Sequence, residues 1–180
     1  MFGNYFRKMK GTTKSPPRVK WSEICWSWLG GFVGISVVAY LNQSVLEATG
    51  QMLFIASFGA SAVLLFGAVK SPLAQPPNLL GGHLLCAVIG VSAYKLLPTH
   101  PWLAAALAVA TSIAAMHATK TLHPPAGATA LIAVMGGEKI HQLGYLFAVM
   151  PVGVGAAVLL AVALLFNNIP RNRRYPEFWI

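Results

Sequence analysis

The residues best suited to chemistry lie in one short run, His123-Pro124-Pro125-Ala126-Gly127-Ala128-Thr129. Proline has no backbone N–H and is best tolerated in the first turn of a helix, so the two prolines predict that a helix begins here. The N–H groups of Ala126, Gly127 and Ala128 would then point away from the helix start. The helix dipole attracts an anion at that place without any charged side chain.

Three neighbours of these amides would complete a binding site. Gly127 would let a ligand approach the backbone, and Thr129 would add a hydroxyl group. His123 would stand at the mouth, where imidazole donates a hydrogen bond or carries a proton. The alternative interpretation is a helix start bounded by prolines with a solvated histidine, and the residues alone leave both open.

A similar run occurs earlier in the chain. Gly59-Ala60-Ser61-Ala62-Val63-Leu64 resembles Gly127-Ala128-Thr129-Ala130-Leu131-Ile132, 68 residues further on. Ser57, Gly59, Ala60 and Ser61 would then be the partner of the first site. With three membrane segments in each half, the second half would insert upside down, as in many transporters whose substrate site lies between inverted repeats. Close helix packing by small residues and chance similarity are the alternatives.

A third polar feature is the loop that runs from Ser71 to Asn78 and leads into Gly81-Gly82-His83. Its three prolines make it rigid for a membrane connection. Asn78 and His83 could line a cytoplasmic entrance. A turn followed by a helix start, with His83 bonded to a backbone carbonyl, is the alternative.

The composition indicates the solvent in which these elements sit. Of the 180 residues, 56% are hydrophobic and 9% are charged, whereas soluble domains carry about 25% charged residues. Six apolar stretches separated by turn residues predict an all-α membrane protein, a bundle of about six membrane segments. They span 21–41, 51–69, 79–97, 102–117, 124–137 and 144–166.

The fifth stretch is too short to cross a hydrocarbon core about 30 Å thick, so it is expected to be a half-helix or a re-entrant segment. The second stretch has Gly59 in its middle and raises the same expectation. Four or six full crossings both place the two tails on one side. Lys and Arg concentrate in those tails, which predicts cytoplasmic termini and favours membrane anchoring over nucleic-acid binding.

The acidic residues set limits on function. The chain has four, all Glu, at segment ends or in loops, and no Asp. A carboxylate-rich metal site, a paired-carboxylate hydrolase and a nucleotide-binding loop are therefore not expected. We predict no metal, no cofactor and no enzymatic activity; Ser61 with His123 is the only nucleophile and base pair worth naming. A basic membrane interior without acids favours an anionic or neutral solute over a cation.

Three stretches in order resemble the HPP family of integral membrane proteins. They are Phe58 to Phe66, then Ser71 to Asn78 with Gly81-Gly82-His83, then His123 to Leu131. The resemblance extends over about 26–166. It implies about four membrane spans and, because members in plant plastids and cyanobacteria are associated with nitrite transport, a nitrite carrier or channel.

The sequence thus predicts a transmembrane HPP-like domain over 21–167 between basic cytoplasmic tails at 1–20 and 168–180. The predicted function is transport of a small monovalent anion, nitrite first, across a bacterial inner membrane. The expected partners are that anion and the lipid bilayer, and a homodimer is compatible with the small size of the chain. A non-transporting membrane assembly protein is the main alternative.

Overall fold

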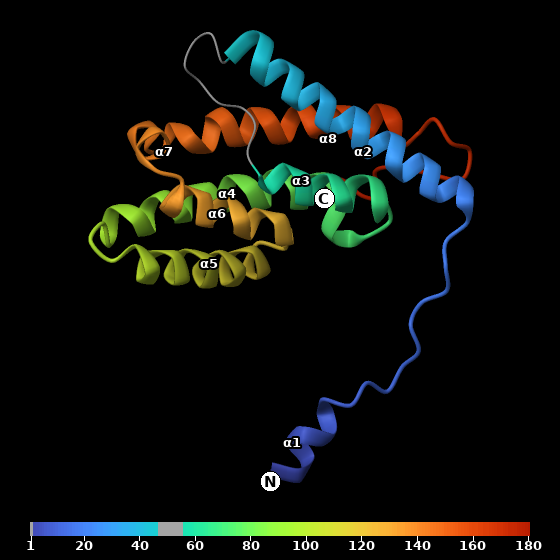
Figure 1. The fold of residues 1–180 in the computed structure, drawn as a ribbon, viewed down its shortest axis with the longest axis horizontal. Coiled ribbons are helices and arrows are strands. Elements are labelled where there is room, and N and C mark those ends of the chain that lie inside the picture. The colour runs from blue at the N-terminus through green and yellow to red at the C-terminus, as the bar shows by residue number, and fades with distance from the viewer. Residues whose placement is uncertain (1, 47–55) are drawn as a thin grey trace.

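The computed structural model describes residues 2–46 and 56–180, and every regular element in them is helical (Figure 1). Four helical stretches are long and apolar enough to cross a membrane: 21–44, 76–96, 101–118 and 148–166. Two shorter apolar stretches cover 57–67 and 124–135. The all-α prediction is confirmed, as is the prediction that the second and fifth segments are short. Residues 51–55 of the predicted second segment lie outside the described residues.

The helices follow one another with short connections. Two are long and unbroken: α4 covers Pro76–Leu96 and α5 covers Pro101–Ala118. Two other long helices adjoin a π-helical turn. The turn Asn42–Leu46 follows α2, Trp21–Leu41, and the turn Ala148–Gly153 precedes α8, Val154–Phe166. The short elements are α1 Phe2–Lys8, α3 Ser57–Ala62 with its π-helical turn Val63–Gly67, the 3-10 turn Pro72–Ala74, α6 Pro124–Met135 and α7 Glu138–Leu143.

Prolines fix several of these starts. Pro76 and Pro77 occupy the first turn of α4, so this helix begins before Leu79, where the apolar run alone placed it. Pro101 begins α5 and Pro124 begins α6 in the same way. Proline's missing N–H is harmless in a first turn because that N–H has no helical partner there. Pro76, Pro77 and Pro101, interpreted from the sequence as turn residues, are therefore the first residues of helices. The third and fourth predicted segments accordingly begin earlier than predicted.

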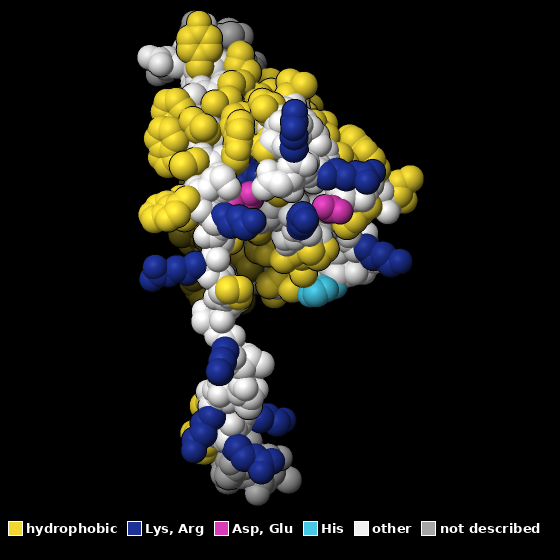
Figure 2. Space-filling view, turned by 90° about the vertical axis from the view of Figure 1, so that its right-hand side faces the viewer, with side chains coloured by type: hydrophobic (Ala, Val, Ile, Leu, Met, Phe, Trp, Pro, Cys, Tyr) yellow, Lys and Arg dark blue, Asp and Glu magenta, His cyan; other side chains and the backbone are white. Residues whose placement is uncertain are grey.

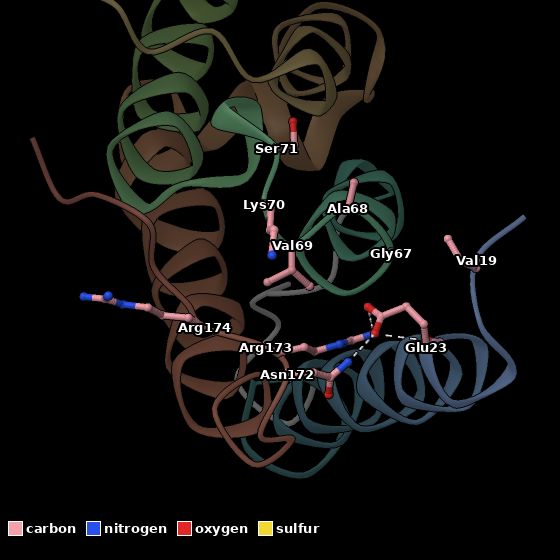
Figure 3. A pocket seen from close by; sticks show the side chains of 10 residues that line it. All are labelled: Val19, Glu23, Gly67, Ala68, Val69, Lys70, Ser71, Asn172, Arg173 and Arg174. Carbon is pink, nitrogen blue, oxygen red and sulfur yellow. Dashed lines mark hydrogen bonds and ion pairs between the residues drawn. The ribbon is translucent and has the colours of Figure 1, made fainter. Parts of the chain in front are cut away.

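Basic side chains gather at one end of the bundle, the end that faces the reader in Figure 2. The start of α2, the connection after α3 and the segment after α8 meet there. They line a cavity of about 360 Å³, whose wall includes Lys70, Arg173, Arg174 and Glu23. Figure 3 shows Arg173 reaching Glu23 while Arg174 points away. The predicted basic tail after residue 167 is thus partly packed against the bundle, whereas residues 5–20 are exposed.

We call residues 167–177 the C-terminal strap because they tie this end together. Arg173 pairs with Glu23 at 2.7 Å and donates to Ser27 and Asn167. The Tyr175 hydroxyl donates to the carbonyl of Ala74, and burial raises the pKa of this phenol, so it stays a donor. The backbone N–H of Glu177 donates to Gln75. The strap therefore holds the connection between α3 and α4 from outside.

Replacing Glu23 with glutamine should lower the thermal unfolding midpoint. The Arg173 side chain is only 3% exposed, so losing its carboxylate leaves a guanidinium charge poorly compensated in a buried place. Such a loss costs roughly 1–3 kcal/mol. The matched control is Glu138→Gln, because Glu138 is exposed and accepts only from Gln142. Equal midpoints for the two variants in detergent would show that the strap is not held by this pair.

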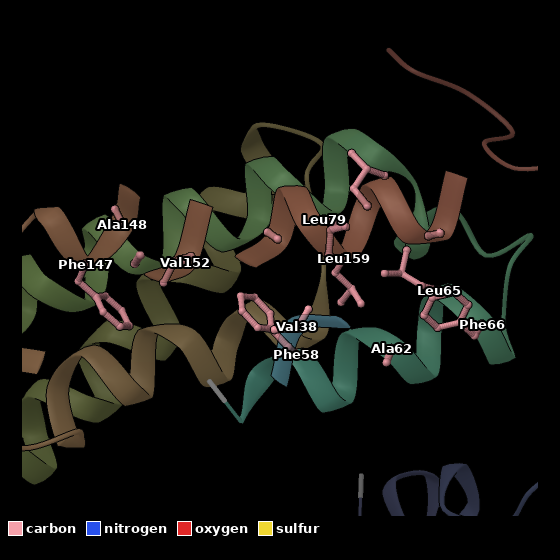
Figure 4. Close-up of a cluster of buried hydrophobic side chains, with 14 of the residues drawn as sticks. Val38, Phe58, Ala62, Leu65, Phe66, Leu79, Phe147, Ala148, Val152 and Leu159 are labelled. Carbon is pink, nitrogen blue, oxygen red and sulfur yellow. The ribbon is translucent and has the colours of Figure 1, made fainter. Parts of the chain in front are cut away.

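The main apolar core lies between α8, α4 and the α3 segment (Figure 4). Phe58, Phe66 and Phe147 are its largest fully buried side chains. Two glycines of α2 make room for one of them: a Cβ at Gly30 or Gly34 would stand 2.5 or 2.6 Å from the Phe66 ring. Small residues at helix interfaces allow such close approach in membranes. This packing fixes the α3 segment in the bundle, which in turn positions the polar residues beside it.

Candidate functional site

Five polar side chains meet inside the bundle and form what we call the histidine–serine network. Ser57 and Ser61 come from α3, His83 from α4, Thr129 from α6, and His123 from the residue before α6. Each is at most 1% exposed. Ionisable side chains such as histidine are rare among membrane helices and usually functional, whereas Ser and Thr hydroxyls commonly hydrogen-bond between helices. The network is therefore the strongest candidate site in the described residues.

Hydrogen bonds connect all five side chains. The Ser61 hydroxyl oxygen lies 2.8 Å from His83 Nε2 and 2.9 Å from His123 Nε2. On the other side of its ring, His83 Nδ1 is 2.7 Å from the Thr129 hydroxyl, which donates to Ser57 Oγ at 2.9 Å. The two imidazole centroids are 5.1 Å apart. One serine thus bridges two histidines, and the network closes back onto α3 through Thr129.

His123 is oriented by the backbone of the turn before α4. Its Nδ1 lies 2.7 Å from the carbonyl oxygen of Leu73, so this nitrogen must carry the proton. The Ser71 side chain accepts from the N–H of Leu73 and holds that turn. The sequence alone did not point to Leu73, because its contribution is a carbonyl that any residue would supply. The dense prolines of the loop were the only signal that its backbone is fixed.

The start of α6 is buried because α4 carries glycines opposite it. A Cβ at Gly82 would lie 2.8 Å from His123 Cβ and 2.9 Å from the carbonyl oxygen of Thr121. His123 is extended, with φ −137° and ψ 98°, as expected for a residue before proline. The glycine and the proline together let α6 begin inside the bundle, with His123 aimed at Ser61.

Antiparallel alignment of the two short helices explains which residues meet. Ser57 bonds Thr129, while Ser61, four residues later, meets His123, six residues before Thr129. Residues four apart lie on one face of a helix, so both serines face the network. Gly59 and Ala60 do not: Ala60 is exposed, and Gly59 lines an apolar cavity of about 560 Å³ next to α2.

The predicted amide site at the α6 start is only partly open. The N–H of Ala126 donates to the carbonyl of His123 at 2.9 Å and is already used, contrary to the expectation of a free amide. Pro125 and Ala126 are buried, Pro124 and Ala128 are exposed, and the place of a Cβ on Gly127 is open space. The side chains of His123 and Thr129 point to the network, while Gly127 lies on a different side of the helix.

Asn78 and His83 were predicted to line a cytoplasmic entrance, but both side chains are buried in the bundle. His83 is fully buried in the network and bonds side chains, not a backbone carbonyl. Asn78 is 5% exposed; its amide nitrogen donates to the carbonyl of Leu122, and its Oδ1 has no hydrogen-bond partner. Asn78 thus ties α4 to the connection before His123 and leaves one buried acceptor beside the site.

The network holds two histidines but no carboxylate or thiol. No group of three or more His, Cys, Asp or Glu able to hold a metal occurs within residues 2–46 and 56–180. Phe58 packs edge-on against the His83 ring at 5.4 Å between centroids. The chemistry open to this arrangement is hydrogen bonding and proton movement between two imidazoles through one hydroxyl.

Comparison with known proteins agrees with the three motifs. The family model described as HPP, transmembrane region, matches residues 16–176. Two proteins of Dictyostelium discoideum, each named a transmembrane protein, are 47% and 48% identical over 181 aligned residues. The alignments cover 99% and 97% of this chain but 58% and 63% of those relatives, so the chain spans about three fifths of their length. No solved structure matches it significantly. The chain belongs to the HPP family of transmembrane proteins.

Proposed function

We propose that this chain moves a small monovalent anion, nitrite first, across a plasma membrane, with the histidine–serine network as its binding centre. One observation carries the proposal: five hydrogen-bonded polar side chains are buried where two short helices meet between longer, apolar ones. Helix packing alone does not require two buried imidazoles, because ionisable groups are costly to hold among membrane helices. The family resemblance to nitrite transporters supports the same substrate class.

The arrangement of helices supports the inverted repeat that this proposal includes. α2, α3 and α4 would correspond to α5, α6 and α8. Contacts of α4 with α5 and α6 then have counterparts in contacts of α8 with α2 and α3. In Figure 1, α2 and α4 run away from the basic end, while α5 and α8 run back toward it. Each helix therefore has an oppositely directed partner, as in transporters with a central substrate site.

Charge supports the proposed orientation. Lys70, Arg173 and Arg174 gather at the end of the bundle shown in Figure 2. The exposed basic segment before α2 joins the bundle at this same end. Positively charged loops stay in the cytoplasm, so we propose that both termini are cytoplasmic. The side chains of the network lie nearer this end, because His83 is the eighth residue of a 21-residue helix. The Leu73 turn would then separate the centre from the cytoplasm.

A serine beside a histidine is also the arrangement of a nucleophile and its base. We propose no such chemistry, because the Ser61 hydroxyl is shared between two imidazoles and is fully buried. We likewise propose that the chain needs no cofactor or nucleic acid, only the anion and the lipid bilayer.

Nitrite uptake into liposomes that hold only this protein tests the proposal. The parent chain should accumulate nitrite faster than protein-free vesicles, and His123→Gln should reduce that protein-dependent rate at least tenfold. His100→Gln is the matched control, because the exposed His100 side chain hydrogen-bonds with its neighbour Thr99 and lies outside the network. Chloride, nitrate and acetate in parallel define the substrate class. Uptake equal to that of protein-free vesicles for every anion would favour a non-transporting membrane protein.

A further inference from the structure

The hydrogen-bond network contains one proton too few. Ser61 has a single hydroxyl proton, yet its oxygen lies 2.8 Å from His83 Nε2, 2.9 Å from His123 Nε2 and 3.2 Å from the Ser57 carbonyl oxygen. The carbonyl contact is the longest, so the count that matters concerns the two shorter contacts with the imidazole nitrogens. A hydroxyl donates once and accepts twice, so one of these nitrogens must itself carry a proton if both contacts are to be hydrogen bonds.

Both rings are fixed by what lies on their far sides. The Leu73 carbonyl only accepts, so His123 carries its proton on Nδ1. Thr129 gives its hydroxyl proton to Ser57 and so must accept from His83 Nδ1. A neutral imidazole has one N–H, which leaves both Nε2 atoms as bare acceptors facing Ser61. One of the two contacts between Ser61 and an Nε2 atom then has no proton. In that contact the lone pairs of oxygen and nitrogen face each other, with the two atoms less than 3 Å apart. An added proton on either Nε2 repairs the defect.

The groups that surround the two rings decide whether the charge of such a proton is balanced. The groups that contact them are Ser61 and Phe58 from α3, the Leu73 carbonyl from the turn before α4, Thr129 from α6, and each other. Among the described residues, the hydrogen-bond and ring partners of the two imidazoles include no Asp, Glu, Lys or Arg. An unpaired cation in a low-dielectric interior is strongly disfavoured. The closed arrangement thus requires a proton and at the same time excludes its charge.

We propose that the proton enters together with the transported anion, so that the network works as an electroneutral proton–anion symporter. This inference rests on the proposed function and names its coupling ion. The incoming proton binds one Nε2, which then donates to Ser61, and Ser61 donates to the other Nε2. The anion supplies the negative charge that the site lacks. When the anion leaves, the added proton leaves from the same nitrogen, and no net charge crosses the membrane.

The test measures proton and nitrite movement in the same proteoliposomes. An interior pH dye follows protons, and valinomycin with potassium sets the membrane potential. After subtraction of protein-free vesicles, which correct for acid crossing the bilayer unaided, nitrite influx should acidify the interior with about one proton per nitrite. Its rate should rise with an inward proton gradient and should not change between positive and negative potentials. Influx that follows potential without acidification would overturn the symport inference while leaving anion transport intact.

Thr129→Val provides the sharper variant. Valine keeps the shape but neither donates nor accepts, so His83 is free to move its proton to Nε2 and donate to Ser61. Ser61 then donates to His123, and the Ser61 contacts with both Nε2 atoms are complete with both rings neutral. Nitrite flux should fall because Thr129 belongs to the binding centre, and the flux that remains should carry less than one proton per nitrite and become sensitive to potential. His83→Gln should act alike, because its amide donates to Ser61 without an added proton.

Thr111→Val, at an exposed position on α5, is the matched control and should keep the parent's proton-to-nitrite ratio. Folding of each variant is checked by its elution profile in detergent. A parental ratio in both Thr129→Val and His83→Gln would overturn the proton count. A complete lack of protein-dependent nitrite flux in the parent would instead overturn the proposed function.

Discussion

Replacing Ser61 with alanine is expected to reduce protein-dependent nitrite flux by at least tenfold, the largest functional loss of any single methyl-sized change in this chain. Among the residues that the structure describes, only the Ser61 side chain hydrogen-bonds with both imidazoles, at 2.8 and 2.9 Å. Without its hydroxyl, neither Nε2 keeps a hydrogen-bond partner among the described residues, and no hydrogen-bonded path joins the two rings. Initial uptake rates in proteoliposomes at matched protein content measure the loss.

The same variant should be less stable than the parent. A buried polar atom left without a partner costs about 1–3 kcal/mol, and the substitution leaves two. Ser112→Ala is the matched control, because Ser112 is equally buried but lies on α5, outside the network. It should retain the parent's flux and lose little stability. Parental flux in Ser61→Ala would remove the bridge from the mechanism and leave Ser61 a packing residue.

Replacing Gly90 with alanine should cause the largest loss of stability among single glycine-to-alanine changes. A Cβ at Gly90 would stand 2.5 Å from the carbonyl oxygen of Ala130 and 2.7 Å from Ala133 Cβ. The first contact is backbone, so no rotamer change relieves it, and α4 must move away from α6. Overpacking of this kind costs about 1–3 kcal/mol or more. Because α6 positions Thr129, nitrite flux should fall as well.

Gly31→Ala is the control for Gly90→Ala. Gly31 is also helical, but a Cβ there meets no heavy atom within 4 Å. Alanine favours helix over glycine by up to about 1 kcal/mol in water, so this variant should be neutral or slightly stabilised. Thermal unfolding in detergent, followed by loss of the monodisperse elution peak, compares the two. Similar midpoints would mean that α4 and α6 do not pack as closely as the structure shows.

The sequence was sufficient to predict the class of fold and the parts of the site, for identifiable reasons. Long apolar runs with few charges specify membrane helices, and paired prolines at 124 and 125 specify a helix start. The motif similarity brought Ser61 and Thr129 into one hypothesis, and the structure places both in the network. Ser57, which the same hypothesis included, lies four residues before Ser61 and therefore shares its helix face.

The remainder depended on tertiary contacts that spacing does not encode. Helical rotation turns Gly59 about 200° away from Ser57, so a small residue between two serines faces the opposite side. The prediction grouped it with the serines because their chemistry was considered without that rotation. His83 gained its partners from two other helices, and Leu73 acts through a carbonyl. Neither role follows from residue type, since each depends on where α3, α4 and α6 cross.

The C-terminal strap has a consequence for the order in which the protein is made. Glu23 and Arg173 are 150 residues apart, and Tyr175 closes onto Ala74 over 101 residues. During synthesis these earlier groups remain without their partners until α8 and the strap after it have been made, and Glu23 lacks the Arg173 cation in the meantime. Assembly of the basic end therefore cannot precede synthesis of the strap, so the two ends of this domain come together late in its folding.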